Sequence, residues 1–176
     1  MTIEDKAASP SEAGAGLASF ALSAVRALLG VVLIGLVLLN VINAVARAIG
    51  EVVIGVDEVL VFGMIWMVMI GMMLVTADRS HIALEILTAR VGPRAVNILS
   101  IITHAVMAAS CGYAAVQSFG FVQRIVASGQ TSMALGMPMV IPHSALLVGF
   151  AGTAVIAAMI VVSDVRQLSH SRGGRA

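Results

Sequence analysis

Four long apolar stretches, separated by short polar segments, constrain the fold of this chain more than any other feature of its sequence. Each stretch approaches or exceeds the about 20 residues that a helix needs to cross the hydrocarbon core of a bilayer. None shows the apolar–polar alternation of a barrel strand, so a helix is the expected spanning form. The sequence therefore predicts an all-α integral membrane protein with four transmembrane helices. The stretches run from Ala27 to Ala46, from Val59 to Ala77, from after Arg94 to at least Phe121, and from about Ile141 to Val162.

The composition supports this class and excludes others. Hydrophobic residues make up 60% of the 176 residues and charged residues only 11%, against about 25% charged in an average soluble domain. The net charge of +1, without a basic cluster interleaved with aromatics, gives no reason to expect a nucleic-acid partner. A single cysteine, Cys111, excludes an intrachain disulfide and a thiolate metal cluster.

Polar segments at both ends and between the second and third stretches complete the expected organisation. We expect a flexible cytoplasmic tail over residues 1–17, a four-helix membrane domain over residues 18–165 and a second such tail over residues 166–176. Residues 78–94 mix polar and apolar residues at helical spacing, with His81 and Glu85 at i and i+4 beside an apolar stripe. This pattern predicts a short interfacial helix between transmembrane helices 2 and 3.

The distribution of basic residues predicts the orientation. Eight of the ten Lys and Arg residues fall on one side of the predicted membrane domain, and only Arg47 and Arg124 fall on the other. Short cytoplasmic loops and tails carry the excess of positive charge, so both termini are expected in the cytoplasm. The eight are Lys6, Arg26, Arg79, Arg90, Arg94, Arg166, Arg172 and Arg175.

Polar residues cluster at the outer ends of the first two predicted helices. Asn40, Asn43 and Arg47 share one face at i, i+3 and i+7, which suits interhelical hydrogen bonds or contact with a partner subunit. Asp57 and Glu58 begin the second helix, where Asp57 can cap it and both charges favour the helix dipole. We expect Asn40 and Asn43 to support the fold. For the acidic pair we favour docking of a partner over an internal bridge to Arg47.

Few other polar groups lie inside the predicted spans. His104 is expected to be a neutral, hydrogen-bonded structural residue, and Gln117 to bond another helix. Haem ligation between helices needs two histidines at matched depth, and His81, His143 and His170 all lie near helix ends, so no cofactor is expected. No carboxylate is expected deep in any span, which argues against a pump that acts alone. No metal-binding spacing and no Ser/His/Asp arrangement is evident, so the chain is not expected to be an enzyme.

Methionines and small residues suggest how the helices pack. The second predicted helix is crowded with methionine around Trp66, which is typical of adaptable packing against another apolar surface. Small residues at i and i+4 let helices approach closely. These residues are Met64, Met67, Met69, Met72 and Met73, and the small pairs Ala105/Ala109, Ala108/Gly112 and Gly149/Thr153.

Several motifs together resemble a known family. In order along the chain they are Asn43 with Arg47, Asp57-Glu58, Trp66, Gly71, Arg79-x-His81-Ile82-x-Leu84-Glu85, Thr131-Ser132-x-Ala134-Leu135-Gly136-Met137-Pro138, Pro142 and Gly149-Phe150. In this combination, over roughly residues 20–165, the chain resembles the small membrane subunit of tripartite ATP-independent periplasmic (TRAP) transporters, the DctQ-like family. It departs from the family pattern at His143, Leu147, the Arg79–His81 spacing and Glu85.

The resemblance implies a function. Such subunits pair with a large permease subunit of many helices, a periplasmic substrate-binding protein delivers an organic anion, usually a carboxylate, and a sodium gradient drives import across the bacterial inner membrane. The small subunit would enlarge and steady the scaffold without an active site of its own. Competing interpretations are the small subunit of a tripartite tricarboxylate transporter and the membrane anchor of a redox complex. Candidate docking or interface residues are Arg47, Asp57, Glu58, Trp66, Arg79, His81 and Glu85.

Overall fold

Four long helices account for nearly all of the described chain. The computed structural model describes residues 10–78 and 93–173. Within these ranges the helices are α1 (Pro10–Ala48), α2 (Val56–Ala77), α4 (Pro93–Ser128) and α5 (Val140–Gly173). All four contain a stretch long and apolar enough to cross a membrane, which confirms the predicted all-α membrane fold. The predicted interfacial helix falls almost entirely on residues 79–92, outside the described residues.

The helices extend beyond the apolar stretches identified in the sequence, most clearly α1 and α5. The possible membrane spans are Phe20–Ala48, Val56–Ala77, Ala95–Ser128 and Val140–Leu168. Helix α1 begins at Pro10 and α5 ends at Gly173, so helical structure enters both expected tails. An apolar run measures only what the bilayer can bury, whereas a helix continues wherever its backbone bonds continue. Whether these ends are flexible and cytoplasmic stays a prediction.

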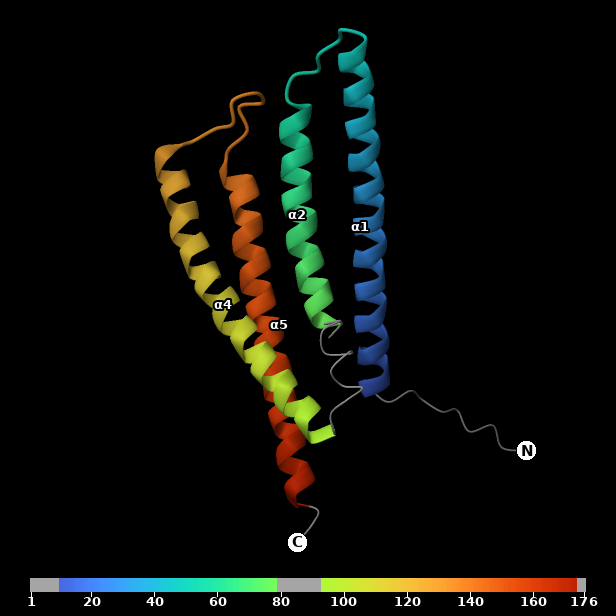
Figure 1. The fold of residues 1–176 in the computed structure, drawn as a ribbon, viewed down its shortest axis with the longest axis vertical. Coiled ribbons are helices and arrows are strands. Elements are labelled where there is room, and N and C mark those ends of the chain that lie inside the picture. Colours follow the sequence, from blue (N-terminus) through green and yellow to red (C-terminus); the bar gives the residue numbers. More distant parts are fainter. Residues whose placement is uncertain (1–9, 79–92, 174–176) are drawn as a thin grey trace, which may run out of the picture.

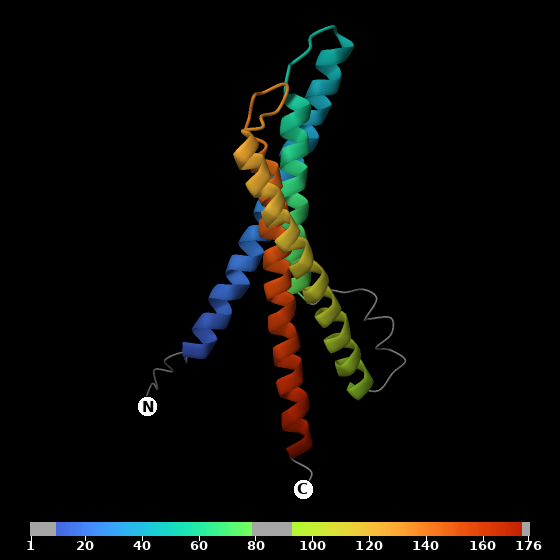
Figure 2. The same cartoon turned by 90° about the vertical axis from the view of Figure 1, so that its left-hand side faces the viewer.

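The helices form an open row rather than a closed bundle. Helix α1 contacts α2, α2 contacts α5, and α5 contacts α4, with no other helix pair in contact among the described residues. Figure 1 shows this order across the molecule, and Figure 2 shows that α1 and α4 diverge at one end. The α1–α2 and α4–α5 loops lie together at the opposite end, here called the loop end (Figure 1). The end from which α1 starts and at which α5 finishes is called the terminal end.

The open row leaves only a small core. Six apolar side chains are buried in the described part, while large apolar side chains are exposed on all four helices, most of all on α1. This distribution suits a chain whose solvent is hydrocarbon, because lipid tails cover apolar side chains as well as a protein core does. The buried apolar residues are Leu74, Ala115, Ile125, Ala145, Ala157 and Ile160.

Two glycines bring α2 and α5 together. Gly149 and Gly152 of α5 face Met69 and Met73 of α2, and an added Cβ at Gly149 would stand 2.7 Å from the Met69 Cβ. Thr153, one turn after Gly149, is buried as well. This contact joins the α1–α2 hairpin to the α4–α5 hairpin, and its small residues are those expected from the sequence.

We predict that Gly149→Ala lowers the melting temperature of the purified protein in detergent, whereas Gly152→Ala changes it little. At Gly149 the new methyl group meets a Cβ that cannot swing away, and such overpacking costs about 1–3 kcal/mol. At Gly152 it meets the end of the flexible Met73 side chain. Gly71→Ala, where an added Cβ meets nothing within 4 Å, is the matched control. Equal melting temperatures for the two α5 variants would contradict this account.

Candidate functional site

A polar cluster at the loop end joins the first two helices. The Asn43 amide Nδ2 donates to Asp57 Oδ1 at 3.1 Å, and Arg47 forms an ion pair with the other oxygen of that carboxylate. Asn43 is buried, as expected for an interhelical bond, but Asn40 is exposed. Only a narrow strip of α1 faces α2. Asn40, three residues before Asn43, points in a slightly different direction and lies outside the contact.

The capping role expected of Asp57 is wrong. The residue that caps α2 is Gly55, which has a φ of 90° and forms no side-chain cap hydrogen bond. Asp57 lies two residues further on, inside the first turn, where its carboxylate still favours the helix dipole. Its hydrogen-bonding capacity is directed toward α1 instead.

Glu58 holds the loop that connects α4 to α5. Its two carboxylate oxygens accept the backbone N–H groups of Ala134 and Leu135 at 2.9 and 3.1 Å. The Leu135 side chain lies against Gly55, where it occupies the space that any Cβ would need. Residue 55 therefore has to be glycine both for its positive φ and for this contact.

The same loop (residues 129–139) is closed by its own hydrogen bonds. Ser132 N–H donates to the Met137 carbonyl at 2.8 Å, and Met139 N–H donates to the Gln130 carbonyl at 3.0 Å. The Ser132 hydroxyl oxygen also accepts the Met137 N–H at 3.1 Å. A short, internally bonded loop presents its free N–H groups in a fixed direction, which is what allows one carboxylate to hold two of them.

Both members of the acidic pair thus bond groups of their own chain. The bonds of Asp57 are the internal bridge that was the alternative to docking. The bonds of Glu58 to the loop are a contact that the sequence did not indicate. The Arg47 and Asp57 side chains are 51% and 63% exposed, and an ion pair so open to solvent contributes about 0–1 kcal/mol. Docking of a partner by these residues stays a prediction.

We predict that Glu58→Ala speeds hydrogen exchange at the Ala134 and Leu135 amides and makes residues 129–139 easier to cut with protease. Without the carboxylate, both N–H groups lose their acceptor, and a charge-assisted hydrogen bond of this kind contributes about 1.5–3 kcal/mol. Glu51→Ala removes an exposed carboxylate from the neighbouring α1–α2 loop and serves as control. Unchanged exchange at both amides in Glu58→Ala would show that the loop holds itself.

A second ion pair closes the α1–α2 hairpin at the terminal end. Arg26 of α1 pairs with Asp78, the C-cap residue of α2. Arg26 and Arg47 stand 21 residues apart, and so do Asp57 and Asp78. At 1.5 Å per residue this spacing is about 32 Å, close to the ~30 Å thickness of a hydrocarbon core. The two ion pairs therefore fit the two boundaries of the apolar layer.

A further polar cluster, not predicted from the sequence, lies between α4 and α5. Asp164 is only 4% exposed and His104 only 2%. The Ser100 hydroxyl donates to Asp164 Oδ2 at 2.8 Å, and His104 Nδ1 lies 2.7 Å from the Ser100 carbonyl oxygen and 3.3 Å from its hydroxyl oxygen. The hydrogen-bonded His104 agrees with the role expected for it. Asp164 is a buried carboxylate that the sequence did not indicate, since the predicted fourth span ends just before it.

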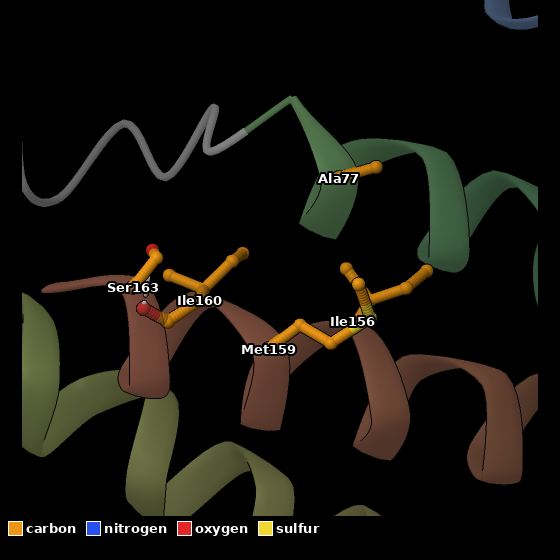
Figure 3. A pocket seen from close by; sticks show the side chains of 5 residues that line it. All are labelled: Ala77, Ile156, Met159, Ile160 and Ser163. Atoms are coloured by element: carbon orange, nitrogen blue, oxygen red, sulfur yellow. Dashed lines mark hydrogen bonds between the residues drawn. The ribbon is translucent and has the colours of Figure 1, made fainter. Parts of the chain in front are cut away.

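An apolar groove lies beside this cluster. Ser163, the residue before Asp164, lines an apolar groove of about 420 Å³ together with Ala77, the last residue of α2. Figure 3 shows Ser163, Ile160, Met159 and Ile156 one after another along α5, with Ala77 facing them from the end of α2. Asp164 stands four residues before the end of the possible Val140–Leu168 span, so it lies near the terminal end of the apolar layer and not in its middle.

The comparison with known families fits these features. Residues 33–167 match the family described as tripartite ATP-independent periplasmic transporters, DctQ component. The chain belongs to this family. A search of curated proteins gives no match. The matched range contains both polar clusters, so they are parts of a DctQ component of a TRAP transporter, which is a transport family and not an enzyme family.

The hydrogen bonds of Ser100 in this DctQ component indicate which nitrogen of His104 carries the proton. A carbonyl oxygen only accepts, so the 2.7 Å contact with the Ser100 carbonyl requires the proton on His104 Nδ1. That nitrogen then cannot take the proton of the Ser100 hydroxyl, which points to Asp164 instead. A histidine that activates a serine accepts the hydroxyl proton on an unprotonated ring nitrogen, and here the nitrogen nearest the hydroxyl carries a proton.

The remaining predicted residues of the DctQ component have simpler surroundings. Trp66 is partly buried on α2. Among the described residues Gln117 bonds its own helix and no other: its Nε2 donates to the Tyr113 hydroxyl one turn earlier on α4, at 2.8 Å, and both side chains are exposed. Arg79, His81 and Glu85 lie outside the described residues.

Proposed function

We propose that this DctQ-family chain is the small permease subunit of a sodium-driven importer of organic carboxylate anions in the bacterial inner membrane. It pairs with a large permease subunit that carries the substrate, and a periplasmic substrate-binding protein delivers that substrate. The observation that supports a scaffold role is the open row of helices, whose broad apolar faces have no partner within the described chain. A subunit with such faces can widen the membrane-embedded part of a larger permease.

The charges of the chain support its proposed orientation. The loop end carries Arg47, Arg124 and the acidic pair, whereas the other eight Lys and Arg residues of the sequence belong to the opposite side. The positive-inside rule then directs the terminal end to the cytoplasm. The loop end, with Glu58 and the 129–139 loop, would face the periplasm and the arriving binding protein.

We predict that both termini are cytoplasmic, so a reporter fused to either one is active only if it is of a kind that works in the cytoplasm. Alkaline phosphatase fused after Ala176 should be inactive, and a fluorescent protein that folds only in the cytoplasm should fluoresce at the same position. A phosphatase inserted in the 129–139 loop should be active and is the positive control. Phosphatase activity at either terminus would reverse the proposed orientation.

We predict that the purified chain alone moves no solute, and that uptake needs all three components. In liposomes with an inward sodium gradient, the chain by itself should give the same uptake of a C4-dicarboxylate or a sugar acid as empty liposomes. Addition of the large subunit and the loaded binding protein should give uptake that stops when the sodium gradient is removed. Uptake by the chain alone, or equal uptake by the large subunit without it, would contradict the scaffold role.

A further inference from the structure

Two hydrogen-bonding side chains are exposed on α4 at a depth where lipid offers no partner. Tyr113 and Gln117 bond each other along the helix, and no further hydrogen bond of either is found among the described residues. Both side chains are exposed, and Tyr113 is 69% exposed. The amide oxygen of Gln117 and one of its N–H groups, and the Tyr113 O–H, therefore remain available to a neighbour.

Shared groove residues show how deep Gln117 lies. Leu146 of α5 lines one groove with Gln117 and another with residues of α2 from Val61 to Met69. Val61 and Met69 stand 4 and 12 residues beyond Asp57, which is about 6–18 Å inside the loop-end ion pair. Gln117 thus lies within the apolar layer, where lipid tails leave polar groups unbonded.

The rest of this surface also suits a protein neighbour. Helix α4 is one edge of the row, with α1 at the other (Figure 1). Ala109, one turn from Tyr113, is small and exposed, so a neighbouring helix can approach the α4 backbone. The groove beside Gln117, of about 440 Å³, also has Ser118 and His143 in its lining. On α1, by contrast, Asn40 is a single exposed amide among Val37, Val41 and other aliphatic residues.

We propose that the α4 face formed by Ala109, Tyr113, Val116 and Gln117 binds a transmembrane helix of the large permease subunit. That helix carries a hydrogen-bonding side chain such as Ser, Thr, Asn or Gln at the depth of Gln117. The α1 edge faces lipid. This assignment rests on the proposed function, because it takes the large subunit as the partner.

Photo-crosslinking tests which face is covered. A photoreactive amino acid replaces Val116, which is 70% exposed on this face, and in a separate protein replaces Val37, which is 53% exposed on α1. Each protein is expressed in membranes with the large permease subunit. We expect an adduct with the large subunit from position 116 and none from position 37. An adduct between two copies of this chain, no protein adduct from position 116, or equal adducts from both positions would overturn the proposal.

Substitution of the polar groups tests what holds the interface. Gln117→Leu should weaken copurification of the large subunit about three- to twentyfold in dissociation constant, the range expected for loss of an interhelical hydrogen bond in a membrane. Asn40→Leu, the matched amide on α1, should change it less than twofold, and the melting temperature of each variant alone reports on folding. Equal effects of the two variants would overturn the proposal. If the unmodified chain does not copurify with the large subunit at all, the proposed function fails as well, whereas copurification without a crosslink at position 116 rejects only this face.

Discussion

The contact between α2 and α5 is the constraint on which the rest of the structure depends. Within residues 10–78 and 93–173, the two helix hairpins that it joins otherwise meet only where Glu58 holds the 129–139 loop. The contact is possible because Gly149 and Gly152 leave room for Met69 and Met73. In a bilayer, apolar burial gives little drive for helices to associate, so close van der Waals contact has to supply it. A pair of glycines facing flexible methionines meets that need, and the carboxylate of Glu58 fixes the same two hairpins at the loop end.

The row of helices also explains the composition of the chain. A closed bundle would hide its apolar side chains inside, whereas this layer exposes them on both faces. Each helix is therefore apolar over most of its circumference, and the sequence shows long runs instead of a periodic stripe. The few polar groups within the spans therefore differ clearly in their surroundings: Asn43 bonds another helix of its own chain, whereas Gln117 bonds only its own helix among the described residues and is exposed.

The sequence predicted the elements of this fold better than their contacts. Apolar runs predicted four spans because the bilayer acts on every face of a helix at once, and this requires no knowledge of which helices meet. The bond of Asn43 to Asp57 follows from their position at facing helix ends. The burial of Asp164 was missed because a hydropathy run ends at the first charge, whereas burial depends on the face of the helix. Asp164 continues the buried face of Thr153, Ala157 and Ile160 at helical spacing, and that pattern is the signal that could have revealed it. The hydrogen bonds between Glu58 and the 129–139 loop could not be predicted, since their donors are backbone N–H groups, which any residue type supplies.

The equal spacing of the two ion pairs gives the α1–α2 hairpin a single register. If α1 slid along α2 by one turn, about 5.4 Å, Arg26 and Arg47 would leave Asp78 and Asp57 at the same moment. Between the ion pairs, Leu36 of α1 lies against Gly63 of α2, and the same slide would move it off the glycine. The two ion pairs therefore favour one register of α1 along α2. Tilting of the whole hairpin keeps both ion pairs when a bilayer becomes thicker or thinner, whereas a shift of one helix along the other breaks both at once.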